Sequence, residues 1–153
     1  MYFHRSLRTA CHVGLPADAA VPPSYVADDR QRMEVYRRFA CALESNEVDA
    51  VLSEVRDRYG PIPDQVGRVA ALARVRILGE RLGVTRMAAI VHDGEERIQL
   101  RCVEPRRVKT ALPGLGTRLR VVDATHCHLL VPAADMVPAR IADAVLHALR
   151  KGP

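Results

Sequence analysis

Aromatic side chains are scarce in this chain of 153 residues. They account for 4% of the sequence, tryptophan is absent, and the six that occur all lie before residue 60. Proteins that bind single-stranded nucleic acid commonly stack the bases on aromatic side chains set among basic ones. The basic residues beyond residue 60 have no such neighbours, so the sequence offers no stacking platform there.

Long apolar runs are also missing. A helix that crosses a bilayer needs roughly 20 consecutive apolar residues, and no stretch approaches that length. The opening MYFHRSLRTACHVGL has no apolar core of the kind that signal peptides carry. We therefore expect a cytoplasmic protein with no membrane partner.

Motifs for nucleotide hydrolysis and nucleophilic catalysis are absent as well. PGLGT lacks the form of a phosphate-binding loop, and no G-x-S-x-G elbow occurs. The four cysteines lie far apart and form no C-x-x-C pair, so neither a zinc ribbon nor a disulfide framework is indicated. We expect reduced thiols, no cofactor and no enzymatic activity.

Positive charge is in modest excess. The formal net charge is +5, the pI is about 9.4, and almost all of the basic residues are arginines. This balance makes an acidic partner, nucleic acid included, worth considering. With 48% hydrophobic residues the chain can build one ordinary core, so we expect a single domain.

The first 27 residues are predicted to form an extended arm. Prolines interrupt the segment CHVGLPADAAVPPSYVADD, so it is expected to be tethered to the domain without regular structure. The predicted organisation is therefore an arm over residues 1–27, a single domain over 28–150 and a tail over 151–153.

Two helices are predicted next. Asp28 and a glutamine three residues on have the spacing of a capping box, which indicates a helix over about residues 29–43. Its apolar stripe consists of Met33, Tyr36, Ala40 and Leu43. The second helix, capped by Ser45 or Asn46, ends at Gly60; its stripe consists of Val48, Val51, Leu52, Val55 and Tyr59.

Residues 65–82 are predicted to form a central helix that Asp64 caps and Gly83 ends. One of its apolar stripes consists of Val66, Val69, Ala70, Ala73 and Ile77. The second, on the far side, consists of Ala71, Val75, Leu78 and Leu82. Because a helix that is apolar on two sides is packed on two sides, we expect the earlier helices against one side and the C-terminal half against the other.

From residue 84 the apolar period changes to two. Asp93-Gly94 predicts one hairpin, and TRLRVVDATHCHLLVP predicts a second that turns near residues 123–125. EPRRVKTALPGL predicts a short helix between them, and MVPARIADAVLHALRKG a last helix with Pro138 in its first turn. The predicted fold is α+β: three N-terminal helices followed by a small, mainly antiparallel sheet in β-β-α-β-β-α order.

A zinc site is one hypothesis for the second half. His126 and His128 share a face of a predicted strand, and Cys102 could lie on a neighbouring strand, which would bring three ligands together. No second ligand set occurs elsewhere in the sequence. Partly exposed strand residues without metal are therefore the favoured interpretation.

A nucleic-acid contact is the other hypothesis. Arg106, Arg107 and Lys109 gather with further basic residues around the short helix and could contact phosphates. Because no aromatic residue accompanies them, a solvated face is the favoured interpretation.

The first half of the chain resembles a known family. The resemblance rests on the segments LPADAAVPPSYVADDRQRMEVYRRFA and VDAVLSEVRDRYGPIPDQVGRVAALARVRILGERLGV. They contain a proline-punctuated arm and an Asp-Arg-aromatic-Gly-Pro-x-Pro corner. In these features the chain is similar to the C-terminal regulatory domain of bacterial transcription-repair coupling factors, over roughly residues 11–150. Residues 1–10 match nothing in the family.

The resemblance implies a non-catalytic clamp. Full-length members are ATP-driven DNA translocases that remove stalled RNA polymerase and recruit nucleotide-excision repair. Their C-terminal module docks on the N-terminal repair module of the same protein and hides the surface that binds excinuclease component A. RNA polymerase and DNA would then be partners only through the full-length protein.

In the family, the docking face has an acidic residue followed by an Asp-Arg pair just before the corner. The matching positions in this chain are Glu54, Asp57 and Arg58. At i, i+3 and i+4 they share one helix face beside the apolar stripe. The resemblance therefore implies that these three bind the partner; the alternative function is a stand-alone basic module that binds nucleic acid.

Overall fold

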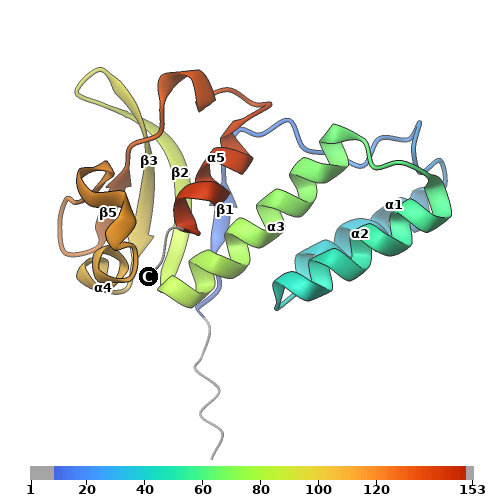
Figure 1. The fold of residues 1–153 in the computed structure, drawn as a ribbon, viewed down its shortest axis with the longest axis horizontal. Coiled ribbons are helices and arrows are strands. Elements are labelled where there is room, and N and C mark those ends of the chain that lie inside the picture. The colour runs from blue at the N-terminus through green and yellow to red at the C-terminus, as the bar shows by residue number, and fades with distance from the viewer. Residues whose placement is uncertain (1–8, 151–153) are drawn as a thin grey trace, which may run out of the picture.

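The computed structural model describes residues 9–150, so the predictions for residues 1–8 and for the tail 151–153 fall outside the described part. The first two helices and the sheet lie at opposite ends of the molecule (Figure 1), and later helices pack against the sheet, which confirms the α+β class. The elements are β1 (His12–Gly14), α1 (Asp29–Cys41), α2 (Ser45–Tyr59), α3 (Asp64–Leu82), β2 (Val84–His92), β3 (Glu95–Cys102), α4 (Pro105–Ala111), η1 (Pro113–Arg118), β4 (Leu119–Val121), β5 (His126–Leu129), η2 (Ala133–Asp135) and α5 (Ile141–Leu149). None of the described helices is both long and apolar enough to cross a membrane.

Five strands form one sheet in the order β1-β2-β3-β5-β4. Neighbouring strands are antiparallel except β1, which runs parallel to β2. Both predicted hairpins are confirmed. Asp93 and Gly94, which join β2 to β3, have φ values of 50° and 77°, as in the type I′ turn that matches the twist of a hairpin.

Helix α3 separates two apolar cores, as predicted. One side packs with α1, α2 and the arm through Val66, Ala70, Ala73 and Ile77. The other side packs with the sheet, α4 and α5 through Ala71 and Val75. The helix therefore fixes the α1/α2 pair relative to the sheet, an arrangement that Figure 1 shows with α3 between them.

Gly79 allows α3 to approach the sheet closely. A Cβ atom at this position would lie 2.7 Å from Cε of Met87 and 2.8 Å from Sγ of Cys11, well inside the 3.5–4.0 Å of normal carbon contacts. Both neighbours are buried. Burial also raises the pKa of the Cys11 thiol to about 12, so the sulfur is an uncharged packing group.

The arm differs from its prediction. It was expected to lack regular structure, but it contributes β1 to the sheet and then packs on both cores. Leu15 joins the core under the sheet, whereas Val21 and Val26 are buried beside α1 and α2. A strand of three residues is too short to show an alternating pattern. Its pairing with β2 joins segments about 70 residues apart in the sequence, which no local pattern encodes.

The caps of the first two helices agree only in part with the prediction. Asp28 caps α1 as expected, because its carboxylate accepts a 2.9 Å hydrogen bond from a backbone N–H three residues on. Helix α2 is instead capped by a capping box of Glu44 and Glu47, so the prediction of Ser45 or Asn46 is wrong. A glutamate side chain can take the same backbone N–H groups when the chain enters the helix one residue earlier.

Two later helix starts also differ. Pro63 is the N-cap of α3, and Asp64 lies inside the first turn. A negative charge there still stabilises the helix by its interaction with the helix dipole. Helix α5 begins at Ile141, so Pro138 precedes the helix and is not in its first turn. A proline suits both a first helical turn and the turn before it, so its position alone does not fix the start.

The apolar stripe predicted for α1 is wrong at both ends and also at Ala40, which is exposed. Met33 and Leu43 are 67% and 49% exposed, whereas Val35 and Phe39 are buried. The helix thus packs through a different pair of residues, spaced i, i+4, with Ala42 completing the buried face. Both sets have helical spacing, and the burial of Phe39, the largest apolar side chain of α1, decides between them.

Val26 tests the contribution of the arm to the core. Val26→Ala removes apolar volume from a side chain that is 0% exposed. At about 0.8 kcal/mol per buried methylene plus a cavity term, the free energy of unfolding should fall by about 2–3 kcal/mol. Val122→Ala, at a position 45% exposed, is the matched control and should change it by less than about 0.5 kcal/mol. Urea denaturation measures both, and equal losses would mean that the arm adds nothing to the core.

Candidate functional site

A groove of about 760 Å³ runs between α1 and α2. Its floor includes Val35, Val55 and Tyr59. The charged residues along it are Arg30, Glu34, Arg38, Glu54, Asp57 and Arg58. Because these are three acids and three arginines, the groove carries both signs of charge and suits a partner that also presents both.

All three residues predicted for the docking face line this groove. Glu54, Asp57 and Arg58 are exposed on α2. They are turned outward because the opposite side of α2 is buried. That buried stripe confirms the prediction and consists of Val48, Val51 and Val55, with Leu52 and Tyr59 half-buried beside it.

Two acids of the groove are already paired. Arg38 forms an ion pair with Glu54 from α1 to α2, and Arg37 pairs with Glu34 along α1 at 2.5 Å. The hydrogen bond from Arg37 lowers the pKa of Glu34. A partner that uses Glu54 must therefore compete with Arg38 or bind the ion pair as a unit, which the sequence did not indicate.

Asp57 and Arg58 are, with Arg30, the charges of the groove that have no ion pair with a described residue. Within residues 9–150, Asp57 has neither a hydrogen bond nor an ion pair. The Arg58 guanidinium lies 5.4 Å from the ring centroid of Tyr59, a contact worth about 0.5–1 kcal/mol at an exposed site. Stacking restricts the arginine while its N–H groups stay free to donate.

The corner after α2 is held by the arm. The hydroxyl of Tyr25 donates a 2.7 Å hydrogen bond to the carbonyl of Gly60, and its ring lies 5.8 Å from the ring of Tyr59. The Tyr59 hydroxyl in turn donates to the side-chain oxygen of Gln31 in α1 at 2.8 Å. Burial raises the pKa of Tyr25. The end of α2, and with it the predicted docking face, is therefore fixed in direction from two sides.

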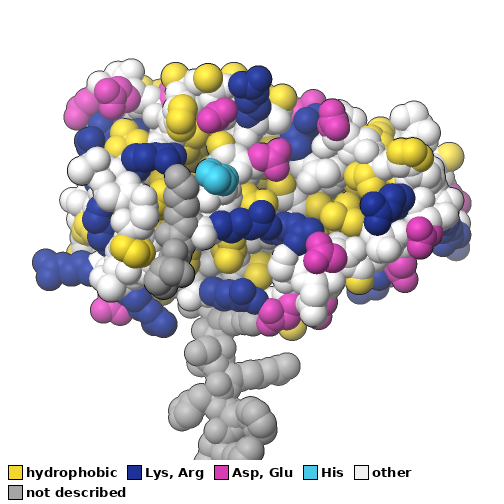
Figure 2. Space-filling view, viewed as in Figure 1, with side chains coloured by type: hydrophobic (Ala, Val, Ile, Leu, Met, Phe, Trp, Pro, Cys, Tyr) yellow, Lys and Arg dark blue, Asp and Glu magenta, His cyan; other side chains and the backbone are white. Residues whose placement is uncertain are grey.

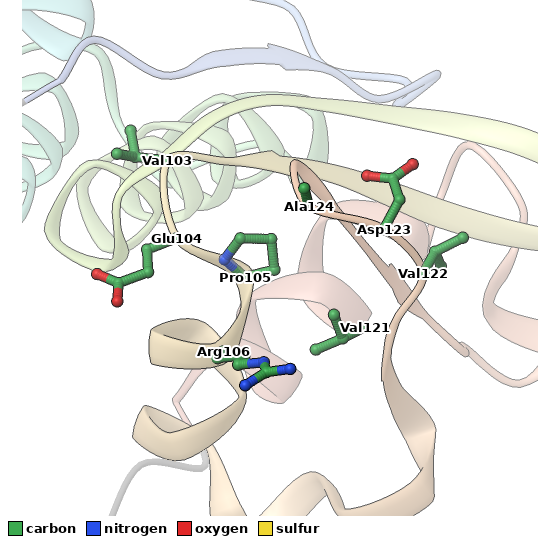
Figure 3. Close-up of a pocket in the computed structure, with 8 residues that line it drawn as sticks. All are labelled: Val103, Glu104, Pro105, Arg106, Val121, Val122, Asp123 and Ala124. Atoms are coloured by element: carbon green, nitrogen blue, oxygen red, sulfur yellow. The ribbon is translucent and has the colours of Figure 1, made fainter.

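The basic residues around α4 do not gather into one site. The ammonium of Lys109 donates to the carbonyls of Gly116 and Leu119, so its charge is directed into the fold. Arg106 lies beside a second groove, of about 530 Å³, between α4 and the β4–β5 turn (Figure 3). That groove includes the exposed valines Val103, Val121 and Val122. Of the predicted set, only Arg106 and Arg107 are exposed for a phosphate.

The zinc hypothesis is not supported by the strand register. Cys102 and Cys127 belong to the core under the sheet, whereas His126 and His128 alternate with Cys127 along β5 and face the other side. His128 is only 2% exposed, which corrects the expectation of partial exposure, and burial lowers its pKa. Among the described residues, no three side chains of His, Cys, Asp or Glu converge on one point. The four cysteines are free thiols.

A comparison with known protein families matches the part of the chain that contains the corner and most of the arm. The TRCF domain model matches residues 15–110. The chain belongs to the TRCF domain family. The resemblance stated from the sequence is thereby confirmed for the segment that carries Glu54, Asp57 and Arg58.

Individual relatives agree with the family. The transcription-repair-coupling factor of Mycobacterium tuberculosis is 48% identical over 77 residues, which is 50% of this chain and 6% of the relative. That of Myxococcus xanthus is 37% identical over 82 residues, 49% of this chain and 7% of the relative. This TRCF chain thus spans a small part of the length of the curated relatives that it matches.

A solved structure shows the same fold. The crystal structure of a C-terminal domain of transcription-repair coupling factor has a TM-score of 0.73 to this chain, with 94% of each chain covered and 18% identity. The second half of the TRCF chain, where the sequence match ends, therefore keeps the family's arrangement of elements.

Metal removal tests the zinc hypothesis directly. Structural zinc binds with an apparent free energy of roughly 10–16 kcal/mol and stabilises the fold by linkage, so its loss would lower the melting temperature markedly. Because Cys102 faces away from His126 and His128, we expect the same melting temperature with and without a chelator. A fall with chelator in the wild type that is absent in Cys102→Ser would contradict this expectation.

Proposed function

We propose that this chain is a non-catalytic regulatory domain of a transcription-repair coupling factor in the bacterial cytoplasm. The groove between α1 and α2 docks on the N-terminal repair module, in the same protein or in trans, and covers the surface that binds excinuclease component A. At this groove, RNA polymerase and DNA act only through the full-length protein. The observation that carries the proposal is the carboxylate of Asp57 beside the guanidinium of Arg58 on the rim of a groove, neither of them in an ion pair with a described residue.

Charge, more than apolar burial, supplies the specificity of this docking. Val35 and Val55 on the groove floor are only 7% and 3% exposed, so a partner removes little further apolar surface from water. At about 25 cal/mol per Å², that term is small. Opposite charges on the repair module, placed against Asp57 and Arg58, fix the register and exclude partners of the wrong sign.

The docking face is also pre-organised. Ordering a flexible side chain at an interface costs about 0.5–1.5 kcal/mol, and Arg58 is already restricted by its contact with Tyr59. The helix below it is anchored by the buried α2 stripe and by the Tyr25 hydrogen bond to Gly60. The groove can therefore release and rebind the repair module without refolding.

Reversal of one charge tests this face. Asp57→Arg should weaken binding of the purified chain to the cognate N-terminal repair module by at least tenfold, because removing one partner of a hydrogen-bonded charge pair costs about 2–5 kcal/mol and about 1.4 kcal/mol already corresponds to tenfold. The free energy of unfolding should change little, since Asp57 is exposed and lies off the buried stripe. Titration calorimetry measures the affinity.

Asp143→Arg is the matched control. Asp143 is an exposed acid on α5 that has no ion pair with a described residue, and it is not among the residues of the groove. Its reversal changes the net charge equally and should leave the affinity within about threefold, as expected of a charge outside the contact. Equal affinities for wild type and folded Asp57→Arg would contradict the proposal and would mean that this face is only a solvated helix surface.

A further inference from the structure

One face of the sheet is covered by helices, and the other carries a different set of side chains. Residues such as Met87, Leu100 and Cys127 point into the core with α3, α4 and α5. Successive residues of a strand point to opposite faces. The alternate positions of β1, β2, β3 and β5 therefore lie on the face that this core does not cover.

Four basic or titratable residues form a row across that face. His12 in β1 is paired with Arg86 in β2, and Arg86 with Arg101 in β3. Arg101 is paired in turn with His126 in β5. Because neighbouring strands are about 4.8 Å apart, the row runs about 14 Å across four strands. His12, Arg86 and Arg101 are exposed, and His126 is half-buried.

The two arginines at the centre of the row have no acidic partner. Like charges placed directly opposite each other in a sheet are destabilising, yet neither guanidinium has an ion pair or hydrogen bond with any residue in the range 9–150. Several arginines elsewhere are paired with acids, as in Arg74 with Asp49 at 2.5 Å and Arg68 with Asp18 at 3.4 Å. On the face of the molecule that Figure 2 presents, the side chains of Lys and Arg are interspersed with those of Asp and Glu.

The residues around the row leave its arginines accessible to a ligand. The register of β2 and β3 shifts next to Arg86, and a β-bulge at such a point re-aims side chains. The next row on the same face holds the small or neutral residues Gly14, Ala88 and Gln99. At the β5 end of the row, the His126 ring is 3.0 Å from the Asp123 carboxylate. The permanent positive charge of the row is that of its two arginines.

We propose that this row, centred on Arg86 and Arg101, binds the phosphate backbone of nucleic acid without reading its sequence. A duplex presents one phosphate per about 3.4 Å of axis on each strand, so a row of about 14 Å lies against about four of them. Planar guanidinium groups suit phosphate oxygens. No aromatic residue lies in any of the four strands, so the row has no stacking contact with bases and recognises phosphate alone.

This surface is separate from the docking groove. The row lies on the sheet, whereas the groove lies between α1 and α2, with α3 between the two parts (Figure 1). Nucleic acid bound to the row therefore leaves Asp57 and Arg58 accessible. Two arginine contacts give weak binding, in the range of roughly 10⁻⁴–10⁻⁶ M that is typical of non-specific complexes at physiological salt.

The test uses the full chain and a fluorescein-labelled 30-base-pair duplex of mixed sequence, with anisotropy read between 50 and 200 mM KCl. The double variant Arg86→Gln/Arg101→Gln should bind at least tenfold more weakly at 50 mM KCl. It should also reduce the slope of log K against log salt by about 1.8, which is two contacts at about 0.9 each. Arg86→Lys/Arg101→Lys keeps both charges and should bind within about threefold of wild type.

Arg106→Gln/Arg107→Gln is the matched control, because it removes the same charge from two exposed residues of α4. It should weaken binding less than threefold. Equal losses in the two glutamine variants would overturn the proposal, since binding would then follow net charge alone. The proposal also fails if wild type does not bind the duplex at 50 mM KCl, or if it binds poly-glutamate of equal charge more tightly than DNA.

Discussion

Helix α3 is buried on two sides at once, and the other elements take their positions from that constraint. Its two apolar stripes hold α1 and α2 on one side and the sheet with α4 and α5 on the other. Gly79 brings the helix so close to β1 and β2 that a single added carbon would collide with Met87 and Cys11. The groove between α1 and α2 and the row of basic residues therefore lie on the two parts of the molecule that α3 joins.

The arm joins the two parts a second time. After β1, which belongs to the sheet, the arm crosses to the helical part, where hydrogen bonds of two tyrosines hold it. Tyr36 in α1 accepts a 2.7 Å hydrogen bond from the backbone N–H of Val21, and Tyr25 of the arm reaches the corner after α2. Arm, first helix and corner thus form one hydrogen-bonded unit, which gives a physical reason for these segments to occur together in the TRCF domain.

Local sequence patterns predicted the elements that obey local rules. The α2 stripe, the two-sided α3 and the Asp93-Gly94 hairpin depend on spacing and turn chemistry, and all are as predicted. Strand β1 and the ion pair of Arg38 with Glu54 depend on contacts between distant segments, so spacing could not reveal them. For the site, the resemblance selected Glu54, Asp57 and Arg58. Only the structure shows that Glu54 is in an ion pair and that Asp57 has none with a described residue.

The central claim is that the α1/α2 groove and excinuclease component A use the same surface of the N-terminal repair module. The most direct measurement immobilises that module, saturates it with excinuclease component A and titrates in this chain. We expect the wild-type chain to displace excinuclease component A at concentrations set by its own affinity for the module, whereas folded Asp57→Arg should not displace it. A stable ternary complex, with the wild-type chain and excinuclease component A bound to one module at saturation, would contradict it.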